Sequence, residues 1–99
     1  MLHIVNKSPF EKNSLQSCLS CAKEGSTILL IEDGVYGVLK NSAVSDAITG
    51  AMKGMTICAL EADVKARGIA DKVIDGVKLV DYNGFVDLTC DNEKLQSWL

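Results

Sequence analysis

Two short stretches, residues 27–31 and 55–60, are rich in apolar residues and lack the alternation of polar and apolar positions that marks a half-exposed strand. Strands of this kind are buried on both faces, which is typical of parallel sheets in α/β proteins. Because parallel neighbours cannot be joined by a tight turn, each pair needs a long crossover, usually a helix. The two stretches therefore predict a layered α/β fold.

The segments between these strands carry helical patterns. In residues 11–23 the apolar side chains recur at i, i+3, i+4 and i+7, which places on one helical face Leu15, Cys18, Leu19 and Ala22. Further helices are expected at 35–39, 43–52 and 61–67, and further strands at 2–5 and 77–80. This alternation predicts a sheet with right-handed crossovers. No internal repeat or linker interrupts it, so we expect one domain over residues 1–99.

Residues 78–89 fit two structures. The pair Asn83-Gly84 between two runs of strand-forming residues matches a β-hairpin with a two-residue turn. A strand that runs into a helix is the alternative, because Phe85, Leu88 and Thr89 share one helical face. The local pattern favours the hairpin.

Composition and charge argue against several classes of function. The formal net charge is −3 and the basic residues are spread along the chain, which gives no basic patch for nucleic acid. The longest apolar run is Ile28-Leu29-Leu30-Ile31, so neither a membrane span nor a secretory signal is expected. We therefore expect a cytoplasmic protein whose four cysteines stay reduced thiols rather than disulfides.

The cysteines suggest chemistry without naming a reaction. Cys18 and Cys21 form a CxxC pair inside the helix expected at 11–23, whereas redox-active pairs lie at a helix N-terminus, so disulfide exchange is disfavoured. Zinc is disfavoured too, because Cys58 and Cys90 form no second pair and His3 is the one histidine. Periodicity makes Cys18 a small buried side chain, puts Cys21 toward the polar face and Cys58 in the core, and leaves Cys90 undecided.

Other polar residues also leave alternatives open. His3, at the start of the first strand, is a general base or a structural histidine. The pair Glu32-Asp33 ends a strand where α/β ligand sites gather, or it is a solvated turn that caps the next helix. No serine lies in a nucleophile-elbow context and no Gly-rich phosphate loop occurs. The residues thus indicate an α/β domain with accessible thiols.

Motifs along the whole chain carry a resemblance to a known family. In order they are Leu2-His3 with Asn6-Lys7-Ser8-Pro9-Phe10, then Leu29-Leu30-x-x-Asp33-Gly34-Val35, Asp63-x-x-Ala66-Arg67-Gly68, Asp81-Tyr82-x-x-Phe85-Val86-x-Leu88-Thr89, and Gln96-x-Trp98. In this order and spacing the sequence resembles the DsrH/TusB family of small sulfur-relay subunits, with the DsrH branch as the nearer one.

The resemblance implies a DsrE-like α/β fold, with a mostly parallel central sheet flanked by helices on both faces. It implies a helix over 82–90, against the local hairpin pattern. It also implies assembly with DsrE/TusD-type and DsrF/TusC-type subunits in a dimer of heterotrimers. That complex would pass sulfane sulfur as a cysteine persulfide to a DsrC/TusE-type acceptor, without a metal or an organic cofactor.

The resemblance also assigns the persulfide to Cys18, because a cysteine in the first helix is a feature of the DsrH branch. The principal sulfur-accepting cysteine of the family lies on the DsrE/TusD-type partner. A carrier thiol must be reachable, so Cys18 is expected to be partly accessible at a subunit boundary, with a lowered pKa. The leading hypothesis is a relay subunit for sulfur oxidation. The alternatives are a TusB-type subunit for 2-thiolation of the wobble uridine in tRNA, and a structural subunit with inert cysteines.

Overall fold

The computed structural model describes residues 1–98, and Leu99, the last residue of the domain expected over 1–99, lies outside this range. The strands are β1 (Leu2–Val5), β2 (Thr27–Leu30), β3 (Thr56–Leu60), β4 (Lys78–Val80) and β5 (Leu95–Trp98). The α-helices are α1 (Ser14–Cys21), α2 (Ser45–Ala51), α3 (Glu61–Ala66) and α4 (Tyr82–Asp91), and the 3₁₀ helices are η1 (Glu32–Val38) and η2 (Ala70–Lys72).

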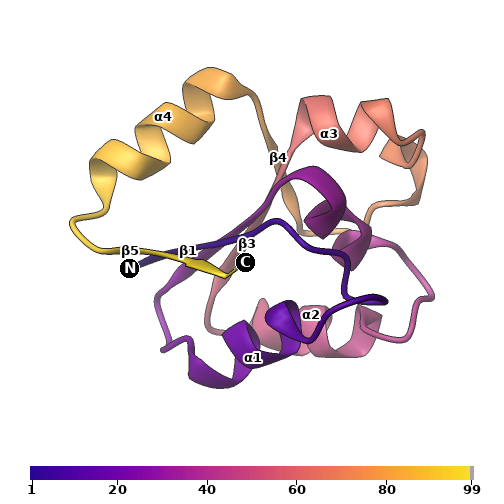
Figure 1. Cartoon of the computed structure of the whole chain (residues 1–99), viewed down its shortest axis with the longest axis horizontal. Helices are drawn as coiled ribbons and strands as arrows, with labels where there is room; N and C mark the ends of the chain where they lie inside the picture. The colour runs from indigo at the N-terminus through magenta and orange to yellow at the C-terminus, as the bar shows by residue number, and fades with distance from the viewer. Residues whose placement is uncertain (99) are drawn as a thin grey trace.

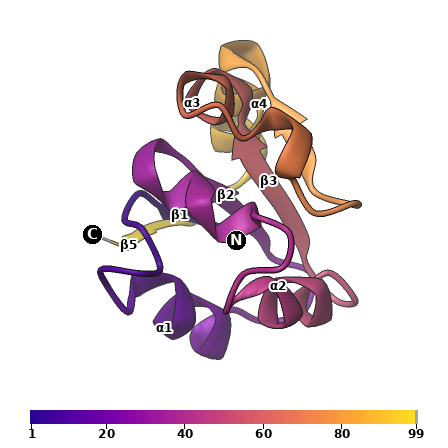
Figure 2. The same ribbon diagram turned by 90° about the vertical axis from the view of Figure 1, so that its right-hand side faces the viewer.

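The strands form one parallel sheet in the order β4-β3-β2-β1-β5. The chain steps in one direction from β1 to β4 and then returns across the sheet to the far edge at β5. Right-handed crossovers that run in opposite directions lie on opposite faces of a sheet. Accordingly, α1 and α2 cover one face and α4 the other (Figure 1, Figure 2). The predicted parallel α/β sheet with helices on both faces is confirmed.

The three central strands send alternate side chains into two apolar layers. The layer under α1 and α2 includes the strand residues Val5, Ile28, Leu30, Ile57 and Ala59. The layer under α4 consists of Leu2, Ile4, Leu29 and Cys58. Full burial of a Leu or Ile side chain stabilises a fold by about 1.5–3 kcal/mol, so covering both layers is the main driving force of this structure.

Residues 82–90 form a helix and not the hairpin that the local pattern favoured. Asp81 caps α4, because its Oδ1 accepts a hydrogen bond from the Gly84 amide at 2.8 Å. Phe85 and Leu88 then pack against the second apolar layer. Burial of these side chains and the cap together outweigh the turn propensity of the Asn-Gly pair.

The sequence pattern does not predict the edge strand β5. Leu95, Gln96 and Ser97 are all exposed, so this strand has no run of buried apolar residues to mark it. Its residues pair in parallel with those of β1. The indole Nε1 of Trp98 donates a hydrogen bond to Nδ1 of His3 at 3.1 Å. The first and the last family motif therefore meet in the sheet, although they lie at opposite ends of the chain.

Two further motifs meet at the carboxyl edge of the sheet. Arg67, after α3, donates from Nε and Nη2 to Asp33 Oδ1 at 3.0 and 2.9 Å. The amide of Glu32, a residue with a positive φ of 50°, donates to Asp63 Oδ2 at 2.7 Å. Asp33 is thus an ion-pair partner and not a helix cap, since η1 is capped by Ile31 without a side-chain hydrogen bond. Glu32 and Asp33 are both exposed, as expected for a solvated turn, and the ion pair with Arg67 is a contact that the sequence did not predict.

Gly34 provides a test of the packing at this edge, because a Cβ atom there would overlap the carbonyl oxygen of Val5. Gly34→Ala should lower the free energy of unfolding by about 1–3 kcal/mol through overpacking. Gly50→Ala is the matched control, since Gly50 lies in α2 and its added Cβ meets nothing within 4 Å. The control should raise stability by about 0.5–1 kcal/mol. Urea unfolding measures both variants, and equal stabilities would contradict the close approach of Gly34 to β1.

Candidate functional site

Cys18 lies on the face of α1 that packs against the sheet. Its side chain is 0% exposed and belongs to the first apolar layer, together with Leu15 and Ile28. Burial raises the pKa of the Cys18 thiol from 9.0 to about 11, and the neighbouring Cys21 adds to the rise. The expected partial accessibility and lowered pKa of Cys18 are therefore wrong for this chain by itself. The small buried side chain that periodicity predicted is confirmed, and the carrier role of Cys18 stays a prediction.

The other cysteines divide into one buried and two exposed thiols, and all four cysteines are free. Cys58 in β3 is 2% exposed, as predicted, and burial raises its pKa. Cys21, the last residue of α1, and Cys90, near the end of α4, are exposed. Thiolates carry out sulfur transfer, and cysteines buried in apolar surroundings are inert. In the folded chain a reagent therefore reaches Cys21 and Cys90.

Cys21 lines a pocket of about 270 Å³ at the amino edge of the sheet. This edge holds the starts of β1 and β5, which lie side by side near the N-terminus in Figure 1. Three separate segments of the chain supply the lining: Met1, His3, Cys21, Lys23, Ser26, Lys94 and Gln96. The lining contains a thiol and lysine ammonium groups but no carboxylate, so the pocket is suited to an anion.

His3 connects this pocket to the edge strand. The His3 residue is 3% exposed, and its Nδ1 accepts the hydrogen bond from Trp98, which leaves the proton of the neutral ring on Nε2. Burial lowers the pKa of His3 below 6.5, and the positive amino terminus lowers it further. The ring is therefore neutral at pH 7. Of the two functions considered for His3, the structure supports the structural one, in which it ties β1 to β5.

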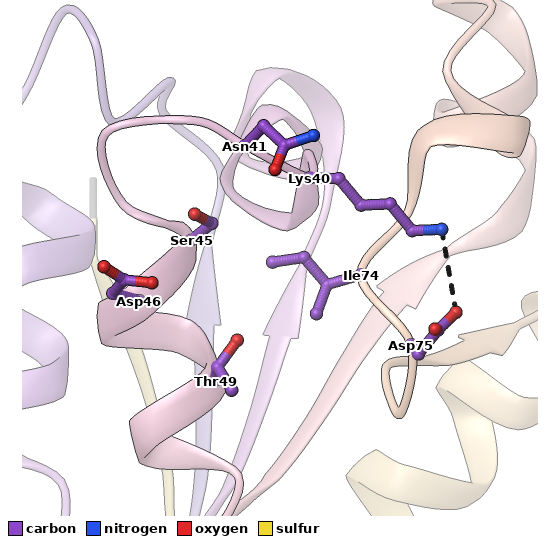
Figure 3. A pocket seen from close by; sticks show the side chains of 7 residues that line it. All are labelled: Lys40, Asn41, Ser45, Asp46, Thr49, Ile74 and Asp75. Atoms are coloured by element: carbon purple, nitrogen blue, oxygen red, sulfur yellow. Dashed lines mark ion pairs between the residues drawn. The ribbon is translucent and has the colours of Figure 1, made fainter.

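A second pocket, of about 380 Å³, lies between α2 and the loop before β4 (Figure 3). Its lining is polar apart from Ile74: Lys40, Asn41, Ser45, Asp46, Thr49, Ile74 and Asp75. Figure 3 shows the Lys40 side chain reaching toward Asp75, with Nζ 3.7 Å from Oδ1. An exposed pair of this kind contributes little to stability. The pocket contains no thiol and therefore no group for sulfur transfer.

Residues 1–98 contain neither a metal cluster nor a membrane-spanning helix. That part of the chain holds no group of three or more His, Cys, Asp or Glu side chains arranged to bind a metal ion. None of its helices combines the length and the apolar character needed to cross a membrane.

The fold has counterparts among solved structures. The ychN protein from E. coli superimposes with a TM-score of 0.78, at 17% sequence identity over 97% of each chain. Protein Tm0979 from Thermotoga maritima has a TM-score of 0.63, at 25% identity over 95% of this chain and 97% of that one. The chain is therefore a small parallel α/β protein of this shared fold, in which the cysteines are free thiols.

Sequence comparison is more specific than the fold. The family described as "DsrH like protein" matches residues 7–95. Protein TusB from Buchnera aphidicola subsp. Baizongia pistaciae is 35% identical over 98 residues, and Protein TusB from Yersinia enterocolitica is 34% identical. Each of these matches covers 99% of this chain and 100% of the relative. The chain belongs to the DsrH/TusB family.

The raised pKa of Cys18 predicts a loss of stability in alkali. The folded chain keeps the thiol proton up to about pH 11, whereas the unfolded chain loses it near pH 9.0. Stability from this group is therefore fully present below pH 9 and falls as the pH rises toward 11. Cys18→Ala should remove up to about 1.4 kcal/mol per pH unit from this slope. Urea unfolding from pH 8 to 11 measures it, and identical slopes in wild type and variant would contradict the burial of the thiol.

Proposed function

We propose that this chain is a TusB-type subunit of a cytoplasmic sulfur relay that supplies sulfur for 2-thiolation of the wobble uridine in tRNA. The observation that carries the proposal is the end-to-end match to relatives named TusB, at 35% identity over 98 residues in the Buchnera protein. The TusB branch of the family is the one that the resemblance links to thiolation. These names favour thiolation over sulfur oxidation, which was the leading hypothesis from the sequence.

Sulfur oxidation in a DsrEFH-type complex is the second candidate. The match of residues 7–95 to the family described as "DsrH like protein" is compatible with it. Cys18 favours it more directly, because a cysteine in the first helix is the feature that resembles the DsrH branch. Both candidates use the same thiol chemistry and differ in the final sulfur acceptor.

The chemistry of such a relay is thiol–persulfide exchange. A thiolate attacks the outer sulfur of a persulfide, and the donor thiolate leaves. We propose that this chain takes part in the exchange together with DsrE/TusD-type and DsrF/TusC-type subunits, and that sulfur passes on to a DsrC/TusE-type acceptor. The free thiols of Cys21 and Cys90 support a part in the exchange, because both are exposed.

Exposed apolar residues support assembly with partner subunits. In α4, Tyr82 and Val86 lie one turn apart and are 67% and 55% exposed, and Leu95 in β5 is 47% exposed. Exposed apolar side chains such as these are available for contact with a partner chain. As the outermost strand, β5 also has an open edge whose backbone groups can pair with another chain.

Complementation tests the proposed function. In a bacterium that lacks its own TusB-type subunit, this chain, expressed with its native partner subunits, should restore 2-thiouridine at the wobble position. Mass spectrometry of nucleosides from hydrolysed tRNA measures the modification, and the partner subunits without this chain are the control. A stable complex that leaves the tRNA without 2-thiouridine would contradict the thiolation proposal and favour sulfur oxidation.

The same assay tests Cys18. A persulfide on this thiol requires α1 to lift away from the sheet in the assembled complex, because the side chain is 0% exposed in the folded chain. If Cys18 is the carrier, Cys18→Ser reduces 2-thiouridine to background, while Cys58→Ser, the matched change of a buried thiol outside α1, retains it. Full thiolation with Cys18→Ser would make Cys18 a structural residue.

A further inference from the structure

We propose that the pocket at the amino edge of the sheet binds a persulfide anion and that Cys21 accepts its outer sulfur atom. The inference rests on the proposed relay function for the chemical class of the donor. It goes beyond that function because Cys21 belongs to none of the motifs that carry the family resemblance. Its support comes from the groups that surround the thiol.

Two hydrogen-bond donors that belong to nearly buried residues open onto the pocket and have no partner within the chain. The Nε2–H of His3 and the hydroxyl of Ser26 belong to residues that are 3% and 5% exposed. Within residues 1–98 neither group makes a hydrogen bond, although Nδ1 of the same histidine is engaged by Trp98. Neither donor is sealed in the core, because Asn6 Oδ1 is the one fully buried side-chain polar atom without a partner in residues 1–98. A ligand that brings acceptor atoms into the pocket would satisfy both.

The charge of the pocket selects an anion. Lys23 and Lys94 line it, and no carboxylate does. Cys21 is the last residue of α1, where the helix dipole disfavours a negative charge. The lysine ammonium groups oppose that effect. They also reduce the repulsion between a thiolate and an anionic donor, which must approach each other for sulfur to move.

The transfer step needs no oxidant. The Cys21 thiol gives its proton to the bound persulfide anion R–S–S⁻, and the Cys21 thiolate attacks the outer sulfur of the resulting R–S–SH. A new sulfur–sulfur bond forms on Cys21 while the bond in the donor breaks, and R–S⁻ leaves with the electron pair and takes a proton from solvent. The products are Cys21–S–SH and R–SH. Sulfane sulfur changes its carrier with no net oxidation or reduction.

Cys90 is the natural comparison for Cys21. Both thiols are exposed and free. Cys90, however, is followed by Asp91 and lies one turn after Asp87, so acidic residues flank it in place of lysines. If exposure alone decided reactivity, the two thiols would respond equally to an anionic sulfur donor.

The experiment treats the purified full chain with inorganic polysulfide, an anionic source of sulfane sulfur, and traps thiols and persulfides with iodoacetamide. Peptide mass mapping follows the gain of one sulfur atom that dithiothreitol removes. Fragmentation of the peptide that holds Cys18 and Cys21 assigns the sulfur to one of them. Cys21 should gain sulfur about tenfold faster than Cys90, which charge attraction in a pocket can provide.

Lysine variants test the pocket separately from the thiol. Lys23→Met with Lys94→Met should slow sulfur gain at Cys21 about tenfold and leave Cys90 unchanged. Lys7→Met with Lys72→Met is the matched control, because it makes the same change in net charge at exposed lysines that do not line the pocket. Circular dichroism confirms that each variant is folded.

Two results would overturn the inference: equal rates at Cys21 and Cys90, or an unchanged Cys21 rate in the Lys23/Lys94 variant. Either would make Cys21 an ordinary exposed thiol. Because the measurement uses the chain and polysulfide without tRNA or an acceptor protein, its failure is distinct from a failure of complementation. Fast loading of Cys21 in a chain that does not restore 2-thiouridine would keep the pocket and reject the thiolation relay.

Discussion

The strands β1, β2 and β3 bury their side chains on both faces of the sheet, and Leu2, Leu29 and Ile57 are each 1% exposed or less. Because such strands expose no polar face to water, helices must cover the sheet on both sides. The rest of the fold depends on this constraint. It places α1 and α2 on one face and α4 on the other, and it requires α1 to present Leu15 and Cys18 to the sheet.

The family motifs have a structural explanation in this arrangement. Arg67 joins the motif after β3 to Asp33, in the motif after β2, through two hydrogen bonds. Trp98 joins the last motif to His3 in the first one. These contacts hold neighbouring strands and their connections in register, and none of them includes a thiol. A match to the motifs is therefore strong evidence for the fold.

Cys21 and the ion pair between Arg67 and Asp33 lie at opposite edges of the sheet. Ligand sites of open α/β sheets lie at the carboxyl edge, but here Arg67 and Asp33 pair at that edge. The pocket with Cys21 lies at the amino edge, beside the start of β5. A donor or a partner subunit that pairs with the open side of β5 would therefore meet the pocket without disturbing the apolar layers. A route through Cys18 would instead disrupt the layer under α1.

The sequence by itself determined the parallel α/β fold, because strands that are apolar on both faces allow few other structures. It also determined the burial of Cys18 and Cys58, since each falls on an apolar face of its element. For residues 82–90 the local pattern favoured a hairpin and the family resemblance predicted the helix, which forms because the packing of α4 on the sheet outweighs the local turn signal. Tertiary structure alone brought Cys21 together with His3 and the lysines, because the pocket is built from segments distant in sequence. Local patterns record which face of an element is apolar, whereas a pocket depends on how several elements come together.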